Sequence, residues 1–251
     1  MRIMSQIVSE IRCNNCGAPL NIQPGELLST CRYCGYTMVV GADAAFQLEH
    51  SLITNNNDQA KVTDVLQDWM RTGFMKPGDL ARKSKITLLE LRYLPFWVIR
   101  LKASSNYEGI LERMAPATPR KGTIENTYDW VVLGRRGTAF PTRDYQIPVA
   151  GKIPFDYAKI ESTAKFLNSE LSSDEAVKQA KDEVDDHQRF LARQDADKIT
   201  SLTTDFEVEK PTYVHAPLWF TQYEYKGRSY NAIIDGSTGE VLRADIPPAG
   251  F

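Results

Sequence analysis

The chain has 251 residues, 42% of them hydrophobic and 25% charged, with a formal net charge of −2. This composition is typical of an ordinary globular protein with enough residues for one or two cores. No apolar run reaches the roughly 18 residues that a membrane-spanning helix requires, and the longest candidate, 88–101, is interrupted by charges and a proline. We therefore expect a cytoplasmic protein without a membrane span.

All the cysteines lie in one motif near the N-terminus, with two residues inside each pair and 14 between the pairs. Two Cys-x-x-Cys turns complete the closed, tetrahedral thiolate shell of structural zinc. Gly17 and Gly35 follow the two pairs, where a zinc knuckle often needs a left-handed backbone. The sequence predicts a zinc ribbon over residues 1–41, with one structural Zn²⁺ and a hairpin turning at Pro24-Gly25. The predicted ligands are Cys13, Cys16, Cys31 and Cys34.

Two alternatives apply to the same cysteines. A pair of disulfides is the first, but we see no signal peptide before them, and disulfides belong to oxidising compartments. A redox Cys-x-x-Cys is the second, but no strand-to-helix pattern surrounds either pair.

Helical patterns follow the ribbon, in an expected helical segment over residues 42–85. Residues 42–53 and 60–72 both look helical, and the second stretch places four apolar residues on one face. Pro77-Gly78-Asp79 is expected to start a short helix ending near Ser84. This resembles a helix-turn-helix outline, although two helices packed under a sheet explain the pattern equally well.

From residue 86 the composition changes to strand formers, and we expect a first β-rich, basic module over 86–152. Its strands are predicted from Ile86 through Ile99, at 130–133 and at 145–149, with Pro95 marking a bulge or an edge. A second module, over 153–251, is predicted to contain a helix over 157–171, a long charged helix running from Ser172 toward Ile199, and closing strands.

The long helix is predicted to begin at a capping box, Ser172-Ser173-Asp174-Glu175. Two hairpins are predicted after it, one turning at Lys226-Gly227 and one at Asp235-Gly236. The segments Leu94–Trp97 and Ala216–Trp219 share a Pro-x-Trp pattern, each followed by Tyr-x-Gly. We interpret this as a divergent internal duplication with buried tryptophans, the alternative being coincidence. The expected fold is α+β: the ribbon, then a mixed α/β body with duplicated antiparallel strand modules and a long charged helix.

Charge is unevenly distributed along the chain. Residues 81–152 carry 13 Lys/Arg and 6 Asp/Glu, whereas residues 153–251 carry 11 and 18. A basic middle segment favours contact with phosphates, and internal charge pairing between the two segments is the alternative. Together with polar and aromatic residues of the second knuckle, the candidate nucleic-acid contacts are Arg32, Tyr33, Tyr36, Arg82, Lys83, Lys85, Arg120, Lys121, Arg135 and Arg136.

The ribbon, the stretch Tyr93–Val98 (YLPFWV) and the closing hairpin Ile234–Val241 resemble a loosely defined group of uncharacterised archaeal and bacterial zinc-ribbon proteins. Relatives in that group often continue into membrane segments, which we do not find in this sequence. The hairpin is also similar to the strand pair of PepSY-type modules, where Asp-Gly-x-Thr-Gly-Glu forms a turn. Neither resemblance implies an established activity, so no catalytic residue is carried over.

No enzyme motif emerges from the sequence. The three histidines, His50, His187 and His215, lie outside known catalytic patterns, and Glu183 with His187 is better explained by a solvated helix face than by a metal site. We therefore expect a non-enzymatic binding protein. One hypothesis is docking on nucleic acid or a ribonucleoprotein, with association to ribosomes or transcription. The other is a protein adaptor or assembly factor, or a homo-oligomer, that uses the ribbon and the sheet edges.

Overall fold

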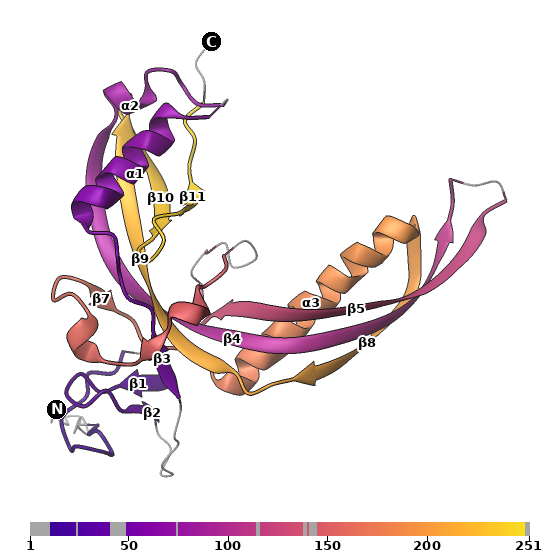
Figure 1. The fold of residues 1–251 in the computed structure, drawn as a ribbon, viewed down its shortest axis with the longest axis horizontal. Coiled ribbons are helices and arrows are strands. Elements are labelled where there is room, and N and C mark those ends of the chain that lie inside the picture. The colour runs from indigo at the N-terminus through magenta and orange to yellow at the C-terminus, as the bar shows by residue number, and fades with distance from the viewer. Residues whose placement is uncertain are drawn as a thin grey trace, which may run out of the picture.

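The computed structural model describes residues 11–23, 25–40, 49–73, 75–113, 116–137, 140 and 145–248. A small ribbon lies beside the corner of a larger body, whose two arms diverge from that corner (Figure 1). In the ribbon, β1 (Leu28–Thr30) pairs antiparallel with β2 (Thr37–Val39). The architecture is mixed α/β, with one large sheet, few helices and a cysteine cluster in the N-terminal ribbon.

Among the described residues, nine strands form the sheet of the body. They are β3 (His50–Leu52), β4 (Lys85–Leu111), β5 (Thr118–Leu133), β6 (Ile153–Pro154), β7 (Lys165–Phe166), β8 (Lys198–Val208), β9 (Thr212–Tyr225), β10 (Arg228–Asp235) and β11 (Val241–Ala244). The helices are α1 (Gln59–Arg71), α2 (Leu80–Lys83) and α3 (Ser173–Asp195), with short 3₁₀ turns η1 (Val149–Gly151) and η2 (Tyr157–Lys159).

Strand β4 takes part in both arms. Its stretch Lys85–Val98 pairs antiparallel with β9, and its stretch Leu101–Ile110 pairs antiparallel with β8. β8 and β9 follow one another along the same edge of β4, separated only by residues 209–211. Two long strand tracts therefore cross the corner side by side in opposite directions, and the two Pro-x-Trp segments pair with each other in one sheet.

The first arm consists of α1, α2, the first half of β4, β9, β10 and β11. Asp58 caps α1, since its side chain accepts a hydrogen bond from the Lys61 backbone N–H. The buried side of α1 packs on the sheet in a cluster that includes Trp219. Its buried residues recur every four positions: Val62, Leu66 and Met70.

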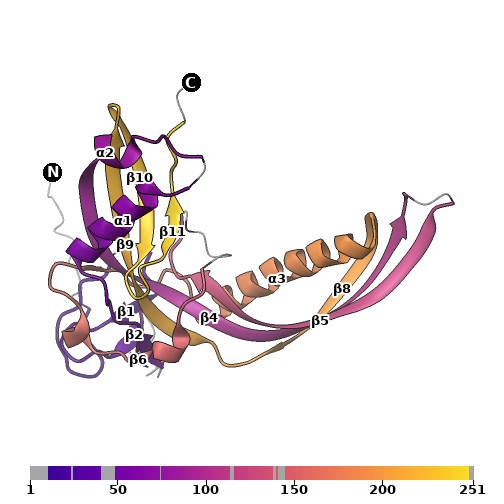
Figure 2. The same ribbon diagram turned by 45° about the horizontal axis from the view of Figure 1, so that its top comes forward.

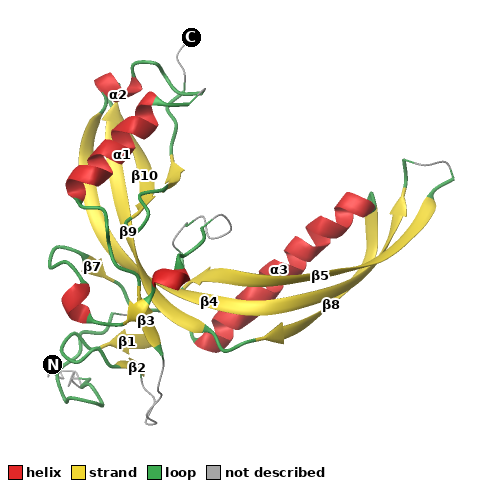
Figure 3. Cartoon of the chain, viewed as in Figure 1, coloured by secondary structure: helices red, strands yellow, loops and turns green. Residues whose placement is uncertain are grey.

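The second arm consists of α3, β8, the second half of β4, and β5. The capping box forms at Ser172: its Oγ accepts from the Glu175 N–H, and the Glu175 carboxylate accepts from the Ser172 N–H. Small residues on the buried side of α3 let the helix approach the sheet closely, against Trp97. Figures 2 and 3 show α3 along one face of this arm, with the β4–β5 hairpin extending beyond it. The buried small side chains of α3 are Ala176, Ala180, Val184 and Ala192.

The turns that lead into α1 and α3 make matching contacts. The Trp219 indole N–H donates to the carbonyl of Asn57, just before the cap of α1, at 3.0 Å. The Trp97 indole N–H donates to the carbonyl of Leu171, just before the cap of α3, at 3.3 Å. Each tryptophan therefore ties one strand to the start of the helix that covers it.

The prolines of the two Pro-x-Trp segments also match. The Gly134 N–H donates to the Pro95 carbonyl and the Gly236 N–H donates to the Pro217 carbonyl, both at 2.8 Å. An added Cβ would approach the proline carbonyl to 3.1 Å at Gly134 and to 3.0 Å at Gly236. The nearest atoms to that Cβ would be the Ser169 Oγ at 2.6 Å and the Asn55 Oδ1 at 2.5 Å, so a side chain at either position would force these groups to shift.

Two short parallel strands complete this match. β3 runs parallel to β9 at Tyr213–His215, and β7 runs parallel to β4 at Arg92 and Tyr93. The residue after each strand then donates its N–H across the corner: Ile53 to the His215 carbonyl at 2.9 Å, and Leu167 to the Tyr93 carbonyl at 3.1 Å.

Three expected elements differ from the structure. Residues 145–148 form no strand, and η1 begins at Val149. The helix predicted over 157–171 is wrong: that stretch contains only η2 and β7, joined by turns. The helix predicted over 42–53 is wrong at its described end, where β3 forms, and residues 42–48 lie outside the described residues, as does Pro24.

Candidate metal centre

The two cysteine turns have the same local geometry. The N–H of Gly17 donates to the Cys13 carbonyl at 2.8 Å, and that of Gly35 donates to the Cys31 carbonyl at 2.9 Å. Both glycines adopt a left-handed backbone conformation, with φ of 71° and 72°. Residues with a Cβ atom rarely adopt this conformation, because the Cβ clashes with the backbone. This geometry turns both sulfurs of each pair toward the other pair.

The four sulfurs form one cluster. The Cys13 and Cys34 Sγ atoms are 3.6 Å apart, and the Cys16 and Cys31 Sγ atoms are 3.7 Å apart. All four lie within 4.8 Å of one another, and none forms a disulfide. A tetrahedral shell with Zn–S bonds of about 2.3 Å separates its sulfurs by about 3.8 Å. The cluster therefore fits one metal ion with four thiolate ligands.

Metal binding at such a site depends on ionisation of its thiols. Burial raises the pKa of the Cys13 thiol. Because a metal binds the thiolate, loading releases protons and weakens as the pH falls. Within the described part of the chain, no other group of three or more His, Cys, Asp or Glu side chains is gathered closely enough to hold a metal ion.

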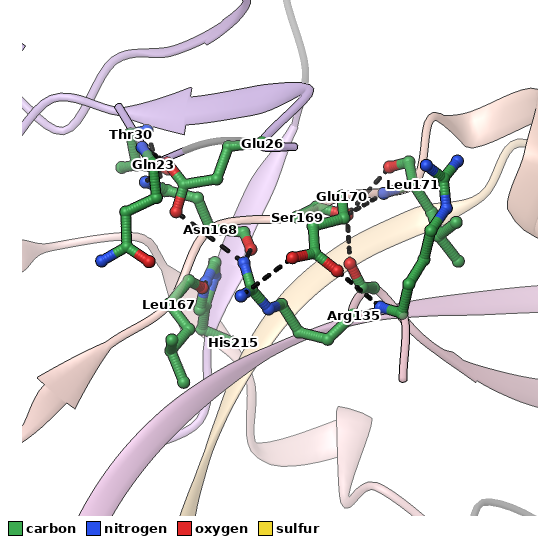
Figure 4. A network of polar contacts seen from close by, with 12 residues as sticks. Gln23, Glu26, Thr30, Arg135, Leu167, Asn168, Ser169, Glu170, Leu171 and His215 are labelled. Atoms are coloured by element: carbon green, nitrogen blue, oxygen red, sulfur yellow. Dashed lines mark hydrogen bonds and ion pairs between the residues drawn. The ribbon is translucent and has the colours of Figure 1, made fainter. Parts of the chain in front are cut away.

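A buried polar network fixes the ribbon to the second arm (Figure 4). The N–H groups of Leu27 and Leu28 donate to the Ser169 carbonyl, and the Thr30 N–H donates to the Asn168 side chain. Ser169 precedes the cap of α3, so the ribbon is held at the same turn that Trp97 contacts. Leu28 joins the apolar cluster of this arm.

Arg135 forms the ionic part of that network. Its guanidinium lies 2.9 Å from a Glu170 carboxylate oxygen and 3.8 Å from a Glu26 oxygen, and it donates to the Asn168 carbonyl at 3.1 Å. The Arg135 side chain is 16% exposed and that of Glu26 only 3%. Arg135, predicted as a nucleic-acid contact, thus lies inside the ribbon–body interface. Sequence reasoning missed this role, since Glu26 and Glu170 are far from Arg135 in the chain.

A second link between ribbon and body is a chain of neutral histidines. His215 Nε2 lies 2.8 Å from the Leu167 carbonyl and must donate to it, so its Nδ1 accepts from His50 Nε2 at 2.7 Å. His50 Nδ1 then accepts from the Thr37 hydroxyl of β2 at 2.9 Å. Burial lowers the pKa of His215 to about 3, and burial followed by the nearby His215 lowers that of His50. His215 is fully buried and His50 is partly buried, and both ring nitrogens of each are used in hydrogen bonds, so we interpret them as structural groups.

The remaining candidate contacts are spread over the molecule. Arg32 and Tyr33 are exposed on the second knuckle, and Tyr36 lies nearby, half-buried. Arg82, Lys83 and Lys85 lie at the far end of the first arm, whereas Arg120 and Lys121 lie at the tip of the second (Figure 1). Arg136 is engaged with Glu175 at 2.6 Å. The structure does not gather these residues on one surface.

Ion pairs link the basic and acidic segments instead. Arg100 pairs with Glu209, Arg113 with Asp197, and Lys102 lies 4.0 Å from Glu207. Residues of α3 that the sequence suggested as a solvated face also contact β5: Glu183 accepts a hydrogen bond from the Trp130 indole, and the His187 ring packs against Tyr128. Internal charge pairing therefore accounts for part of the charge segregation in the sequence.

Comparison of the chain with protein-family models, curated proteins and solved structures returned no match. Among the described residues, no helix is long and apolar enough to cross a membrane.

Proposed function

We propose that the four cysteines hold one structural Zn²⁺ and that the protein is a non-enzymatic adaptor or assembly factor. Four thiolates occupy all the positions of a tetrahedral ion, which leaves none for a substrate. His215 is buried, His50 is partly buried, and both are hydrogen-bonded at both ring nitrogens. Four closely spaced free thiols also fit a reducing compartment, which supports a cytoplasmic location.

We infer that the body arose by internal duplication. Two observations support this. The order β3 then α1 in the first half corresponds to β7 then α3 in the second half. In each half a tryptophan of the Pro-x-Trp segment donates to the turn before a helix, and a later glycine donates to the proline of the same segment. Each arm combines the helix of one copy with the Pro-x-Trp strand pair of the other. Such an exchange yields one rigid sheet from two modules, which suits a scaffold.

The observation that carries the adaptor proposal is the fixed presentation of the second knuckle. The ribbon is held to the body by the Glu26–Arg135–Glu170 network and the His50–His215 chain, while the Tyr33 side chain on the knuckle is 67% exposed. An exposed aromatic on a rigid support is a typical anchor for a protein partner.

The test is affinity purification from the native cells with covalent cross-linking and mass spectrometry. We expect one partner to cross-link at the knuckle. This partner should be lost from an Arg32→Glu/Tyr33→Ala variant and retained by a matched Arg82→Glu/Lys83→Glu variant. A partner lost equally from both variants, or no partner at all, would contradict the proposal.

A second candidate is docking on nucleic acid or a ribonucleoprotein through the same knuckle. Arg32 beside exposed Tyr33 favours it, because a base stacks on an aromatic ring while arginine meets phosphate. Retention on RNA would weaken steeply with salt, whereas an apolar protein interface would not. The dispersal of the other basic residues favours the adaptor.

A further inference from the structure

Within the part of the chain that the structure describes, the outer edge of β5 is unpaired, whereas the matching edge of β10 is covered. Gly134 and Gly236 occupy matching positions, so β5 corresponds to β10 residue by residue from these glycines backward. On β10, the outward edge pairs with β11 at Ala232–Ile234. On β5, no strand of the described chain pairs with the outward edge.

The backbone groups on that edge can be assigned from the register. Gly134 donates to Pro95, and hydrogen-bonded pairs alternate along an antiparallel ladder, so Val132, Trp130 and Tyr128 bond to β4. The N–H and C=O groups of Thr127, Asp129 and Val131 therefore point outward. The corresponding outward residues of β10 bond to the β11 segment, as the Asp245 N–H donates to the Asn231 carbonyl at 2.8 Å and the Asp235 N–H donates to the Glu240 carbonyl at 2.8 Å.

A groove of about 560 Å³ follows this edge. One side is formed by Tyr128, Trp130 and His187 of α3, and the other by Ile147 and Val149. The three aromatic rings lie within 6.0 Å of one another, centroid to centroid. A strand seated here would place alternate side chains against apolar surfaces on both sides.

The rim of the groove defines the charge of the occupant. Asp129 is on its lining, with the Arg100 guanidinium 3.4 Å from its carboxylate, and Asp182 and Asp186 are exposed on α3, the helix that contributes His187 to the lining. A second copy pairing through its own β5 centred on Thr127 would set Glu125 against Asp129, two like charges directly opposite. Basic residues in the incoming strand meet these carboxylates favourably.

From these observations we infer that the β5 edge binds an extended apolar and basic segment of a partner protein by antiparallel strand addition, in the place that β11 occupies on β10. That the occupant is a protein rests on the proposed adaptor function. The β5 edge itself does not depend on the ribbon. Strand addition supplies main-chain hydrogen bonds, and the two flanking surfaces select the side chains. Phe190, 58% exposed on α3, extends the aromatic side of the groove.

The test uses a peptide with the β11 sequence Val241–Ala244 flanked on both sides by glycine and lysine. Binding to the full chain is measured by isothermal titration calorimetry and by backbone amide NMR. We expect amide shifts at Thr127, Asp129 and Val131. Methylating alternate peptide nitrogens should weaken binding at least tenfold, because it removes the ladder hydrogen bonds while keeping the side chains.

A proline variant tests the same edge from the protein side. Thr127→Pro removes one outward N–H and leaves the ladder to β4 intact, and Thr123→Pro is the matched control further along the same edge. We expect at least tenfold weaker binding for Thr127→Pro alone. If that variant does not fold, the methylated peptide still decides.

Three results would overturn the inference: equal binding of the methylated peptide, amide shifts confined to other surfaces, or a dimer in sedimentation that Thr127→Pro dissociates. The last would assign the edge to a second copy. An Arg32→Glu/Tyr33→Ala protein should bind the peptide normally, because the knuckle is not part of this edge. The knuckle partner therefore tests the adaptor proposal and the peptide tests the β5 edge, so the two proposals can fail separately.

Discussion

The two arms share the contacts that join their strands to their helices, and they differ in the ribbon and the edge strand that pack against them. In both arms a tryptophan contacts the turn before a helix, and a glycine passes over a proline carbonyl. The ribbon, however, forms backbone hydrogen bonds with the Ser169 turn of the second arm, whereas its link to β9 runs through the side chains of Thr37 and His50, and β11 covers the edge of the first arm. The shared contacts maintain the corner of the sheet, so the differences are where a specific function is expected.

The largest expected effect is loss of the metal, which should disturb the two arms unequally. Structural zinc contributes about 10–16 kcal/mol in small zinc domains, so Cys31→Ser should unfold most of the ribbon. Hydrogen exchange should accelerate over residues 27–40, including the Leu27 and Leu28 amides that donate to the Ser169 carbonyl at the turn before α3. The matching turn at Asn55 of the first arm should stay protected. Equal loss of protection at both turns would contradict docking on one arm.

Arg135 should be a stability residue of the second arm. Arg135→Met leaves the carboxylates of Glu26 and Glu170 without their cation, and breaking a buried pair costs about 3–5 kcal/mol. Arg136→Met is the matched control: its ion pair with Glu175 is exposed and should cost less than about 1 kcal/mol. Urea denaturation measures both. Similar small effects would refute the buried network.

The two glycines should respond alike if the arms share one design. Gly134→Ala brings a methyl group to 2.6 Å from the Ser169 Oγ, and Gly236→Ala brings one to 2.5 Å from the Asn55 Oδ1, each also close to a proline carbonyl; overpacking typically costs about 1–3 kcal/mol. Gly151→Ala is the control, because nothing lies within 4 Å of its added Cβ. Chemical denaturation should show two comparable losses and a neutral control; a loss at only one junction would break the comparison.

The last expected effect is a dependence of stability on pH. His215 has a folded pKa of about 3, below its unfolded value of about 6.5, so the unfolded state binds protons first as the pH falls. The stability it contributes is complete above about pH 6.5 and is lost by about 1.4 kcal/mol per unit toward pH 3. His50 acts in the same direction. Denaturation from pH 7 to 4 should show a shallower slope for His215→Gln; an unchanged slope would contradict neutral, buried histidines.

Local signals in the sequence located many elements. The Lys226-Gly227 turn adopts the positive φ values that a tight hairpin requires, and β10 pairs with β11 across the Asp235-Gly236 turn, as predicted. The cysteine spacing likewise predicted the sulfur cluster. Each of these depends on residues close together in the chain, so periodicity and turn chemistry were sufficient.

Long-range contacts explain what sequence patterns could not show. Residues 157–171 carry apolar residues at helical spacing, but this segment is held across the corner, where Tyr93 donates to Glu161 and His215 donates to Leu167. The predicted strand at 145–149 contains Pro148, which lacks an N–H for a ladder. The pairing of His50 with His215 joins residues that no local pattern connects.

The most direct test of the account is the metal and thiol content of the intact protein. Elemental analysis of protein purified without added metal should find one zinc per chain, and the four thiols should become reactive only after denaturation with a chelator. Zinc-free protein that keeps the ribbon protected from hydrogen exchange, or cysteines joined as two disulfides, would contradict a metal-stabilised ribbon presented by the second arm.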